Sequence, residues 1–461
     1  MDPVLHWNSV LLEISRRDFT RGYHNAQQPG PIRTSRAMAI VHLAIHDAIA
    51  FKNNPPAAYL NKKSVAHGLG SLMGNVGDII VGAAVVTLKA LYPRFHAFID
   101  DATGNVDAAA FAEGEAVGNA VLAHRAGDGW NGNLQAGQPE NPTYGQHRAD
   151  PFAPGQSQLG PNWGSVTRFM GPAHQHMDPY PGHGLADFLT DPAYKADYDE
   201  VQELGAVERR SRSAEQQRIG IYWGYDGANN LGVPPRLYNQ VARTIVKART
   251  PGLGMVKTAE LFAAINVAMA DAGIDAWHYK YQYDLWRPVI GIRNEHGGAA
   301  DPFWTPLGAP QTNSAYGTLT PNFPAYPSGH ASFGAALMQT LRLMLGTGSG
   351  PITLQNVLDV EAQLGTPAGV TKVTGEEFTF VSDELDGVAS DPGGSIRTRV
   401  EKTFANFAEP VWENSVSRIY LGVHWRFDGL SSDTSRKIGG VPLGLAVGEE
   451  TANFFKAPPS L

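Results

Sequence analysis

The stretch "FPAYPSGHASFGAALMQTLR" (residues 323–342) joins a Pro-Ser-Gly corner to apolar residues spaced three and four apart, and His330 lies at the junction. This spacing predicts a helix that begins near Ser328 or Gly329 and stops at Gly346. The first amides of such a helix lack carbonyl partners and carry partial positive charge, so they can hold an oxyanion. Ser328 would add a hydroxyl, and His330 a proton that titrates near neutral pH. A simple N-cap by Ser328 beside a surface histidine is the alternative interpretation.

Helical spacing recurs along most of the chain. Apolar residues repeat at three and four in residues 35–51, 78–92, 107–126, 258–273 and 332–345, and alternating strand patterns are scarce. The region between Gly127 and Gly184 is rich in Gly, Pro, Asn and Gln, and we expect it to run over the surface as a long loop. These patterns predict a mostly helical protein of bundled helices with long ordered loops.

Composition indicates a globular protein and limits its partners. The chain has 461 residues, of which 43% are apolar and 17% charged, which is enough for a large core. The net charge of -8 gives no general attraction to nucleic acid or to an anionic membrane. With no cysteine, disulfides and thiolate metal sites are excluded. We find no signal-peptide pattern and no apolar run long enough to span a bilayer, so we expect a soluble protein and leave its compartment open.

A second segment, "DAWHYKYQYDLWRPV" (residues 275–289), carries two cations seven positions apart, Lys280 and Arg287. On one continuous helix they would leave the same face about 10 Å apart along the axis, and their long side chains could reach one anion. Trp277 falls on the same stripe, and we expect Pro288 to end the segment. An ordinary solvent-exposed helix face would show the same pattern.

A third segment, "SVSRIYLGVHWRFDGL" (residues 415–430), contains Arg418, His424 and Asp428. His424 and Asp428 are four apart, so we expect them to lie on one helical face with the carboxylate bound to one ring nitrogen. That contact would fix the tautomer and leave the other nitrogen free as a ligand or nucleophile. A buried His–Asp pair that serves only packing is the alternative.

The three motifs K-x6-R-P, P-S-G-H and S-R-x5-H-x3-D, in this order, resemble the signature shared by the vanadium-dependent haloperoxidases and the superfamily of type-2 phosphatidic acid phosphatases and bacterial acid phosphatases. As a set of three they are highly specific. Similarity to fungal vanadium chloroperoxidases extends over residues 214–430 and, more thinly, to residues 4–8 and 41–48. The small acid phosphatases and the lipid phosphatases lack this long helical N-terminal half, which favours the peroxidase branch.

The resemblance implies an all-α fold of two helical bundles with long ordered loops, as in the vanadium haloperoxidases and acid phosphatases. We expect an N-terminal bundle with a long surface loop region at residues 1–200. Residues 201–461 would form a C-terminal bundle that carries the oxyanion site, and both parts would belong to one compact unit.

The resemblance also implies a role for each matched residue. The oxygens of vanadate would be held by Lys280, Arg287, Arg418, Ser328 and the amide of Gly329. His424 would bind the metal, His330 would act as acid or base on the opposite side, and Lys280 would polarise the oxygen that the halide attacks. Asp226 matches the acidic residue that holds the anion-binding arginine, here Arg418, and Asp428 would support His424.

Two aromatic residues, Trp277 and Phe323, match the halide side of the chloroperoxidase pattern, where algal bromoperoxidases tend to carry histidine or arginine. Apolar walls make it easier to remove water from chloride, so oxidation of chloride as well as bromide is expected. Asn322 departs from the fungal pattern, in which a pair of prolines precedes the phenylalanine. This departure leaves the shape of the pocket and the halide preference open.

The function implied is that of a vanadium-dependent haloperoxidase. Its cofactor would be orthovanadate, without haem or flavin, and its substrates hydrogen peroxide, a halide ion and a small organic acceptor that hypohalous acid halogenates. The alternative is an acid phosphatase that forms a phosphohistidine at His424, with His330 protonating the leaving group. A module that only binds anions is a third possibility, but cations and amides would suffice for it and the two histidines would have no use. The sequence leaves open whether the protein forms a homo-oligomer.

Overall fold

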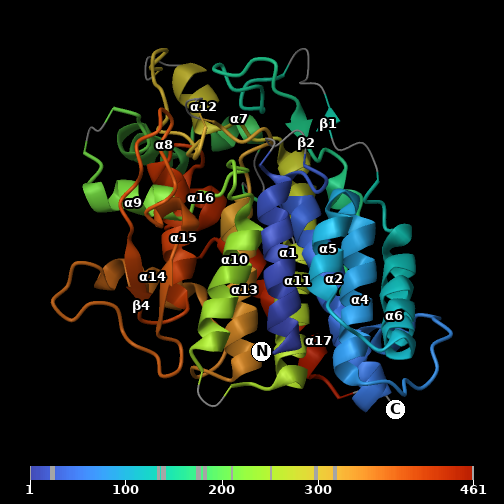
Figure 1. Cartoon of the computed structure of the whole chain (residues 1–461). Helices are drawn as coiled ribbons and strands as arrows, with labels where there is room; N and C mark the ends of the chain where they lie inside the picture. Colours follow the sequence, from blue (N-terminus) through green and yellow to red (C-terminus); the bar gives the residue numbers. More distant parts are fainter. Residues whose placement is uncertain are drawn as a thin grey trace.

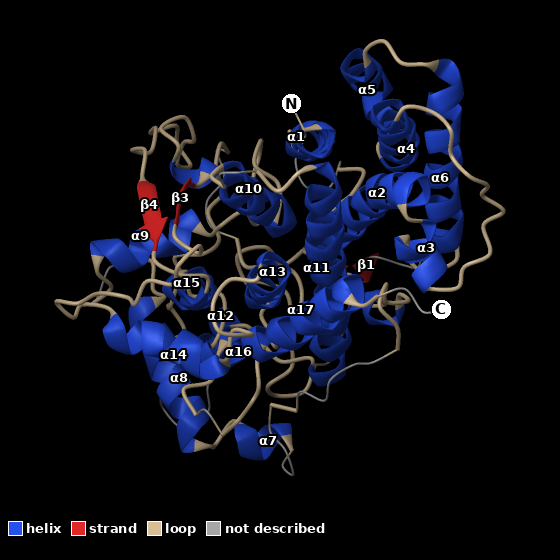
Figure 2. Cartoon of the chain, turned by 90° about the horizontal axis from the view of Figure 1, so that it is seen from below, coloured by secondary structure: helices blue, strands red, loops and turns tan. Residues whose placement is uncertain are grey.

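Helices dominate the fold, as the sequence predicts. The computed structural model describes residues 2–20, 26–131, 135–136, 142–172, 178–179, 184–208, 211–249, 252–294, 300–314, 319–433 and 435–458. The α-helices in these ranges are α1 (Pro3–Asp18), α2 (Gly30–Asn53), α3 (Tyr59–Lys62), α4 (Val76–Leu91), α5 (His96–Thr103), α6 (Ala108–Ala126), α7 (Leu185–Phe188), α8 (Pro192–Leu204), α9 (Ala214–Tyr222), α10 (Pro234–Lys247), α11 (Met255–Tyr283), α12 (Pro288–Asn294), α13 (Gly329–Leu345), α14 (Leu354–Gln363), α15 (Ala408–Tyr420), α16 (Arg426–Gly429) and α17 (Gly440–Lys456). Short 3-10 helices are η2 (Pro55–Ala57), η3 (Pro93–Phe95), η4 (Trp163–Ser165) and η5 (Asp383–Leu385). Strands β1 (Gln135–Ala136) and β2 (Gln158–Leu159) form one antiparallel pair, and β3 (Phe378–Val381) and β4 (Glu401–Phe404) form another (Figure 2).

Helix α11 runs through the middle of the molecule and joins its two halves. On one side it packs against α2, which in turn packs against α4 and α6. On the other side it packs against α13 and α17, and α13 also contacts α15 (Figure 1). The side chains of α11 are buried nearly all round from Thr258 to Lys280, which is why its sequence shows no polar face. The division of the chain at residue 200 stays a prediction.

The contact between α13 and α17 fixes the start of α13. Glycines of α17 lie directly on the α13 backbone: a Cβ at Gly440 would lie 2.4 Å from the carbonyl oxygen of Ser328, and one at Gly444 would lie 2.3 Å from that of Ser332. Larger side chains at these positions would push the helices apart. The close approach therefore sets where the Pro-Ser-Gly corner lies.

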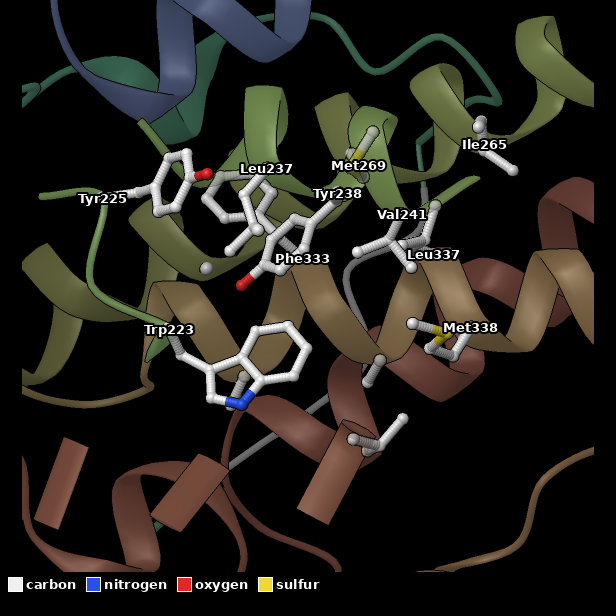
Figure 3. Packing of buried hydrophobic residues seen from close by; sticks show 14 of the residues in the cluster. Trp223, Tyr225, Leu237, Tyr238, Val241, Ile265, Met269, Phe333, Leu337 and Met338 are labelled. Carbon is white, nitrogen blue, oxygen red and sulfur yellow. The ribbon is translucent and has the colours of Figure 1, made fainter. Parts of the chain in front are cut away.

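A second face of α13 packs into the hydrophobic core. Figure 3 shows this cluster, which includes Trp223, Tyr225, Leu237, Tyr238, Val241, Ile265, Met269, Phe333, Leu337 and Met338. The hydroxyl of Tyr238 donates to the carbonyl oxygen of His330 at 3.0 Å. The same carbonyl accepts from the side-chain amide of Asn414 at 2.7 Å. The first turn of α13 is thus held by side chains of α10 and α15.

The predicted helix after the Pro-Ser-Gly corner is confirmed. Helix α13 begins at Gly329 with Ser328 as N-cap, whose hydroxyl oxygen accepts from the amide of Ala331 at 3.4 Å. It ends before Gly346, which has a left-handed φ of 65° that glycine adopts easily. The other four predicted helical segments lie in α2, α4, α6 and α11.

Two helical expectations are wrong. Lys280 and Arg287 do not share a helix, because α11 ends at Tyr283 and Asp284 takes a left-handed φ of 48°. Pro288 begins α12 rather than ending a helix. The backbone of residues 284–286 instead pairs with two other segments: Leu285 accepts from the amide of Ala325 at 2.8 Å, and residues 284 and 286 bond to residues 145–147. These tertiary hydrogen bonds replace the helical ones that the spacing suggested.

The third segment also departs from one continuous helix. His424 lies in the turn between α15 and α16, so the spacing of four to Asp428 does not reflect a shared helical face. In the described part of the chain, no single helix has the length and apolar content needed to cross a bilayer; the bent pair of Val76–Leu91 and Pro93–Thr103 meets these criteria only when the two are taken together.

Candidate active site

Three buried cations meet at the start of α13. Lys280 comes from the end of α11, Arg287 from the linker before α12, and Arg418 from α15. Their exposed fractions are 0%, 0% and 1%, which excludes a solvent-exposed helix face. We call these three residues the cation cup. The ring of Phe323 packs between two of them, with its centroid 5.0 Å from Nζ of Lys280 and 4.9 Å from Cζ of Arg287.

Backbone carbonyls orient the cup. Nζ of Lys280 donates to the carbonyl oxygens of Pro324 at 2.8 Å and Ala325 at 2.9 Å. Nε of Arg287 donates to the carbonyl of Phe323 at 2.9 Å, and its Nη1 to that of Val423 at 2.7 Å. Carbonyl oxygens bring partial negative charge only, so they position these cations without neutralising them.

The cup has more positive charge than its carboxylates balance. Asp226 binds Arg418 through both oxygens, at 2.8 and 3.0 Å, and Asp428 is the second nearby carboxylate. Among the described residues, Nη2 of Arg287 and Nε of Arg418 have no hydrogen-bond partner although both are buried. Burial places the pKa of Lys280 well below its usual value and lowers that of Arg287 to about 9. Unpaired buried N–H groups and excess cationic charge are the features expected of an anion site.

His424 borders the cup in a fixed tautomer. Its Nδ1 lies 2.8 Å from Oδ2 of Asp428, an oxygen that also accepts from the amide of Trp425. Since a carboxylate accepts, Nδ1 carries the proton, and Nε2 accepts from Nη1 of Arg287 at 2.8 Å. Burial, and then the charges of Arg287 and Lys280, hold the pKa of His424 well below its usual value. Once Arg287 releases this hydrogen bond, the Nε2 lone pair of the neutral imidazole can serve as a metal ligand or a nucleophile.

His330, at the first turn of α13, carries its proton on the other nitrogen. Its Nε2 donates to the carbonyl oxygen of Gly224 at 2.7 Å, which leaves Nδ1 as the ring nitrogen able to accept a proton. Burial, and then the charge of Arg418, lower its pKa to about 4. The imidazole is therefore neutral and able to act as a base near neutral pH.

A cavity of about 800 Å³ opens over these groups. It is bordered by His330, His424, Arg418, Asp226 and Gly329, and its remaining wall is largely apolar. Trp277 and Phe323, the two residues expected on the halide side, both line it, with ring centroids 4.7 Å apart. Of the sequence-predicted residues, this cavity is lined by Trp277, Phe323, Gly329, His330, Arg418, His424 and Asp226, whereas Lys280, Arg287, Ser328 and Asp428 lie outside its lining.

Asn322, the position that departs from the fungal pattern, connects this wall to the long loop. Its side-chain amide donates to the carbonyl of Ser157 at 2.7 Å, and its own carbonyl accepts from the amide of Leu159 at 2.8 Å. Leu159 in turn accepts from Nε1 of Trp277 at 3.1 Å. The expectation that the loop region runs over the surface is therefore wrong in part, because residues such as Leu159 and Trp163 are buried and the loop lines the halide side of the cavity.

Sequence reasoning missed two groups near the site. His147 is 1% exposed, neither ring nitrogen has a partner among the described residues, and burial together with Arg287 and Lys280 places its pKa well below its usual value. Glu384 is 0% exposed and binds the backbone next to Asp226. Neither lies in a motif, and only tertiary contacts reveal them.

Buried cations and two oriented imidazoles thus lie together in a helical fold, and known proteins share much of this chain's sequence and fold. A model of the VCPO second helical-bundle domain matches residues 260–457. The vanadium chloroperoxidase of Curvularia inaequalis is 31% identical over 512 aligned positions, which cover 93% of this chain and 79% of that protein. This chain therefore belongs to the vanadium-dependent haloperoxidase family, and its function is of the haloperoxidase type.

Solved structures share the fold over nearly the whole chain. A bacterial vanadium-dependent iodoperoxidase superposes with a TM-score of 0.69 at 20% identity, covering 98% of this chain and 95% of its own. A bacterial vanadium-dependent chloroperoxidase in its holo form gives a TM-score of 0.61 at 15% identity, covering 95% and 96%. At these identities the likeness concerns the fold.

Proposed function

We propose that this protein oxidises chloride and bromide with hydrogen peroxide and halogenates small organic acceptors, using orthovanadate held in the cation cup. The observation that carries the proposal is the excess of buried cations with unpartnered N–H groups beside two oriented imidazoles. This set fits vanadate, which is an oxyanion that also takes a nitrogen ligand. Bound vanadate would supply a Lewis-acid centre that activates peroxide, and the vanadium would keep its oxidation state.

Each residue has a task in this proposal. The oxygens of vanadate would be held by Lys280, Arg287, Arg418, Ser328 and the amide of Gly329. Nε2 of His424 would bind the metal, and Asp428 would keep that nitrogen unprotonated by accepting from Nδ1. Asp226 would orient Arg418 through its two hydrogen bonds.

His330 would move the proton. With Nε2–H bound to Gly224, its Nδ1 can take a proton from hydrogen peroxide and return it to a departing oxygen. Lys280 would polarise the oxygen that the halide attacks and so make it a better electrophile, because its ammonium is oriented by two carbonyls and shielded from water.

The shape of the cavity supports the substrates. Trp277 and Phe323 provide an apolar wall on which chloride and bromide lose water more easily than on a polar one. A halide and peroxide fill a small part of 800 Å³, so the remaining space can admit an organic acceptor of small-molecule size.

One observation favours a second candidate, acid phosphatase activity. The neutral Nε2 of His424 could attack phosphorus, and the cup suits phosphate as well as vanadate because both are tetrahedral oxyanions of similar charge. His330 would then protonate the leaving group.

A side-by-side assay of one preparation tests the two candidates. We expect bromination of a phenolic dye by peroxide and bromide only after orthovanadate is added, with phosphate competing, and little hydrolysis of a phosphomonoester without vanadate. The His424→Ala variant serves as the control that should lose vanadate-dependent bromination. Dye bromination that does not depend on vanadate, or efficient ester hydrolysis alone, would refute the haloperoxidase proposal.

A further inference from the structure

Residues 222–226, which lead into the site, are gripped by the short helix η5 and the residue before it. Oγ of Ser382 donates to the carbonyl of Tyr222 at 2.6 Å. The amide of Asp383 donates to the hydroxyl of Tyr225 at 2.9 Å, and the amide of Tyr225 donates to Oε1 of Glu384 at 2.8 Å. Tyr225 is thus held at both its amide and its hydroxyl.

This grip holds a backbone conformation that is otherwise unfavourable. Tyr225 has a left-handed φ of 54°, which for a bulky residue costs about 1–3 kcal/mol and persists only when the surroundings impose it. Gly224 approaches the carboxylate so closely that a Cβ there would lie 2.7 Å from Oε1 of Glu384 and 2.6 Å from Cγ of Pro310. Any other residue at 224 would displace Glu384 or the chain.

The residues on either side of Tyr225 both bind active-site groups. The carbonyl of Gly224 accepts from Nε2 of His330 at 2.7 Å, and the carboxylate of Asp226 binds Arg418. A rotation of the backbone at Tyr225 would therefore move the acceptor of His330 and the partner of Arg418 together. Glu384 is the only side chain in the described ranges whose bond to the Tyr225 amide opposes this rotation.

Glu384 is itself rigidly held. It is 0% exposed, its Oε2 accepts from Nη1 of Arg397 at 2.6 Å, and the same oxygen accepts from the hydroxyl of Thr312. One oxygen therefore faces the Tyr225 amide and the other faces two donors, one of them charged. A carboxylate held in this way restrains the backbone amide to which it is hydrogen-bonded.

We propose that Glu384 is a positioning residue of the active site: by holding the Tyr225 amide, it places the Gly224 carbonyl so that His330 carries its proton on Nε2 and keeps Nδ1 free. Its effect on turnover rests on the proposed haloperoxidase function, whereas its effect on the His330 tautomer does not. Glu384 touches no substrate and acts only through residues 224–226.

The test compares Glu384→Gln with a matched control, Glu376→Gln. In Glu384→Gln the oxygen of the new side-chain amide would stay with Arg397 and Thr312, so its NH2 group would face the Tyr225 amide and that hydrogen bond would be lost. Glu376 has the same kinds of partner, namely Arg342, the hydroxyl of Thr347 and the amide of Phe407, and is 1% exposed. It lies at the far end of α13, away from the cup.

Two measurements are made on both variants. In vanadate-free protein, ¹⁵N NMR of labelled histidine reports the His330 tautomer; we expect Nε2–H in the parent and in Glu376→Gln, and a mixture in Glu384→Gln. In vanadate-loaded protein, we expect kcat to fall about 10- to 100-fold in Glu384→Gln, with the KM for bromide changed by less than about twofold. An unchanged tautomer in Glu384→Gln, or an equal loss of kcat in Glu376→Gln, would overturn the proposal.

A second variant covers the case in which Glu384→Gln does not fold. Gly224→Ala introduces a methyl group against both Glu384 and Pro310 without removing a buried charge, and it should give the same mixed tautomer and the same fall in kcat. A parent-like tautomer in Gly224→Ala would contradict the proposal. If the parent protein has no haloperoxidase activity, the proposed function fails, but the tautomer measurement still decides the role of Glu384.

Discussion

A buried cluster that contains arginine lies at each end of helix α13, but the two clusters differ in how fully carboxylates balance their positive charge. At the C-terminal end, Arg342 binds both oxygens of Glu376, at 2.7 and 2.6 Å. At the N-terminal end, the three cations of the cup face two carboxylates, and two of their N–H groups have no partner in the described part of the chain. A fully paired cluster has its charge balanced within the protein, whereas an incompletely paired one leaves buried positive charge that an anion can balance. The difference supports the proposed anion site at the start of α13.

The largest expected effect concerns His330, the histidine proposed to move the proton at the N-terminal end. Replacing His330 by Ala should lower turnover by about 100- to 10,000-fold, because the proton acceptor is lost, while vanadate binding changes little. Steady-state bromination and a vanadate titration of the same variant check both parts. If turnover falls only in proportion to lost vanadate, His330 serves binding and the assignment of roles is wrong.

Stability should respond in different ways at the two ends. Arg342→Met should lower the free energy of unfolding by about 3–5 kcal/mol, because Glu376 would be left buried and unpaired. In anion-free protein, the free energy of unfolding of Lys280→Met should stay within about 1 kcal/mol of that of the parent. The substitution removes a poorly balanced charge, and methionine has a side chain of similar length. Chemical denaturation measures both. A loss at Lys280 as large as that at Arg342 would show that the cup is already balanced.

The stability of the protein should also depend on pH through the cation cup. The pKa of Lys280 in the folded, anion-free protein is well below its unfolded value, so between the two values the unfolded chain holds one more proton. Stability should therefore rise with pH in this window, by up to about 1.4 kcal/mol per pH unit from this residue. Comparing the pH dependence of denaturation of the parent and Lys280→Met below the unfolded pKa of lysine isolates the contribution. Identical slopes would mean that Lys280 stays protonated throughout.

The sequence predicts which residues gather at the candidate site better than it predicts the backbone that holds them. The helix at His330 follows from hydrophobic spacing and capping, and both of these signals depend only on residues that are close in sequence. The break between Lys280 and Arg287 does not, because Leu285 leaves the helix to bond Ala325, which is distant in sequence. For His424 and Asp428 the contact was expected, but it forms in a turn and not along a helix.

The hydrogen bond between Glu384 and the Tyr225 amide cannot be predicted from local sequence patterns. The two residues are 159 positions apart, and the contact joins a backbone amide to a buried carboxylate, for which no spacing rule exists. The left-handed conformation of Tyr225 also contradicts its local preference, since tyrosine rarely adopts a positive φ. Departures of this kind gather at functional sites, where surrounding contacts override local preference.

Titration of orthovanadate into anion-free protein, followed by calorimetry, tests the central claim most directly. We expect one saturable site per chain, competition by phosphate, and affinity lowered by about 100-fold or more in His424→Ala but unchanged in Glu376→Gln. Absence of saturable binding, or equal affinity in the parent and His424→Ala, would contradict the claim that the cation cup holds vanadate beside His424.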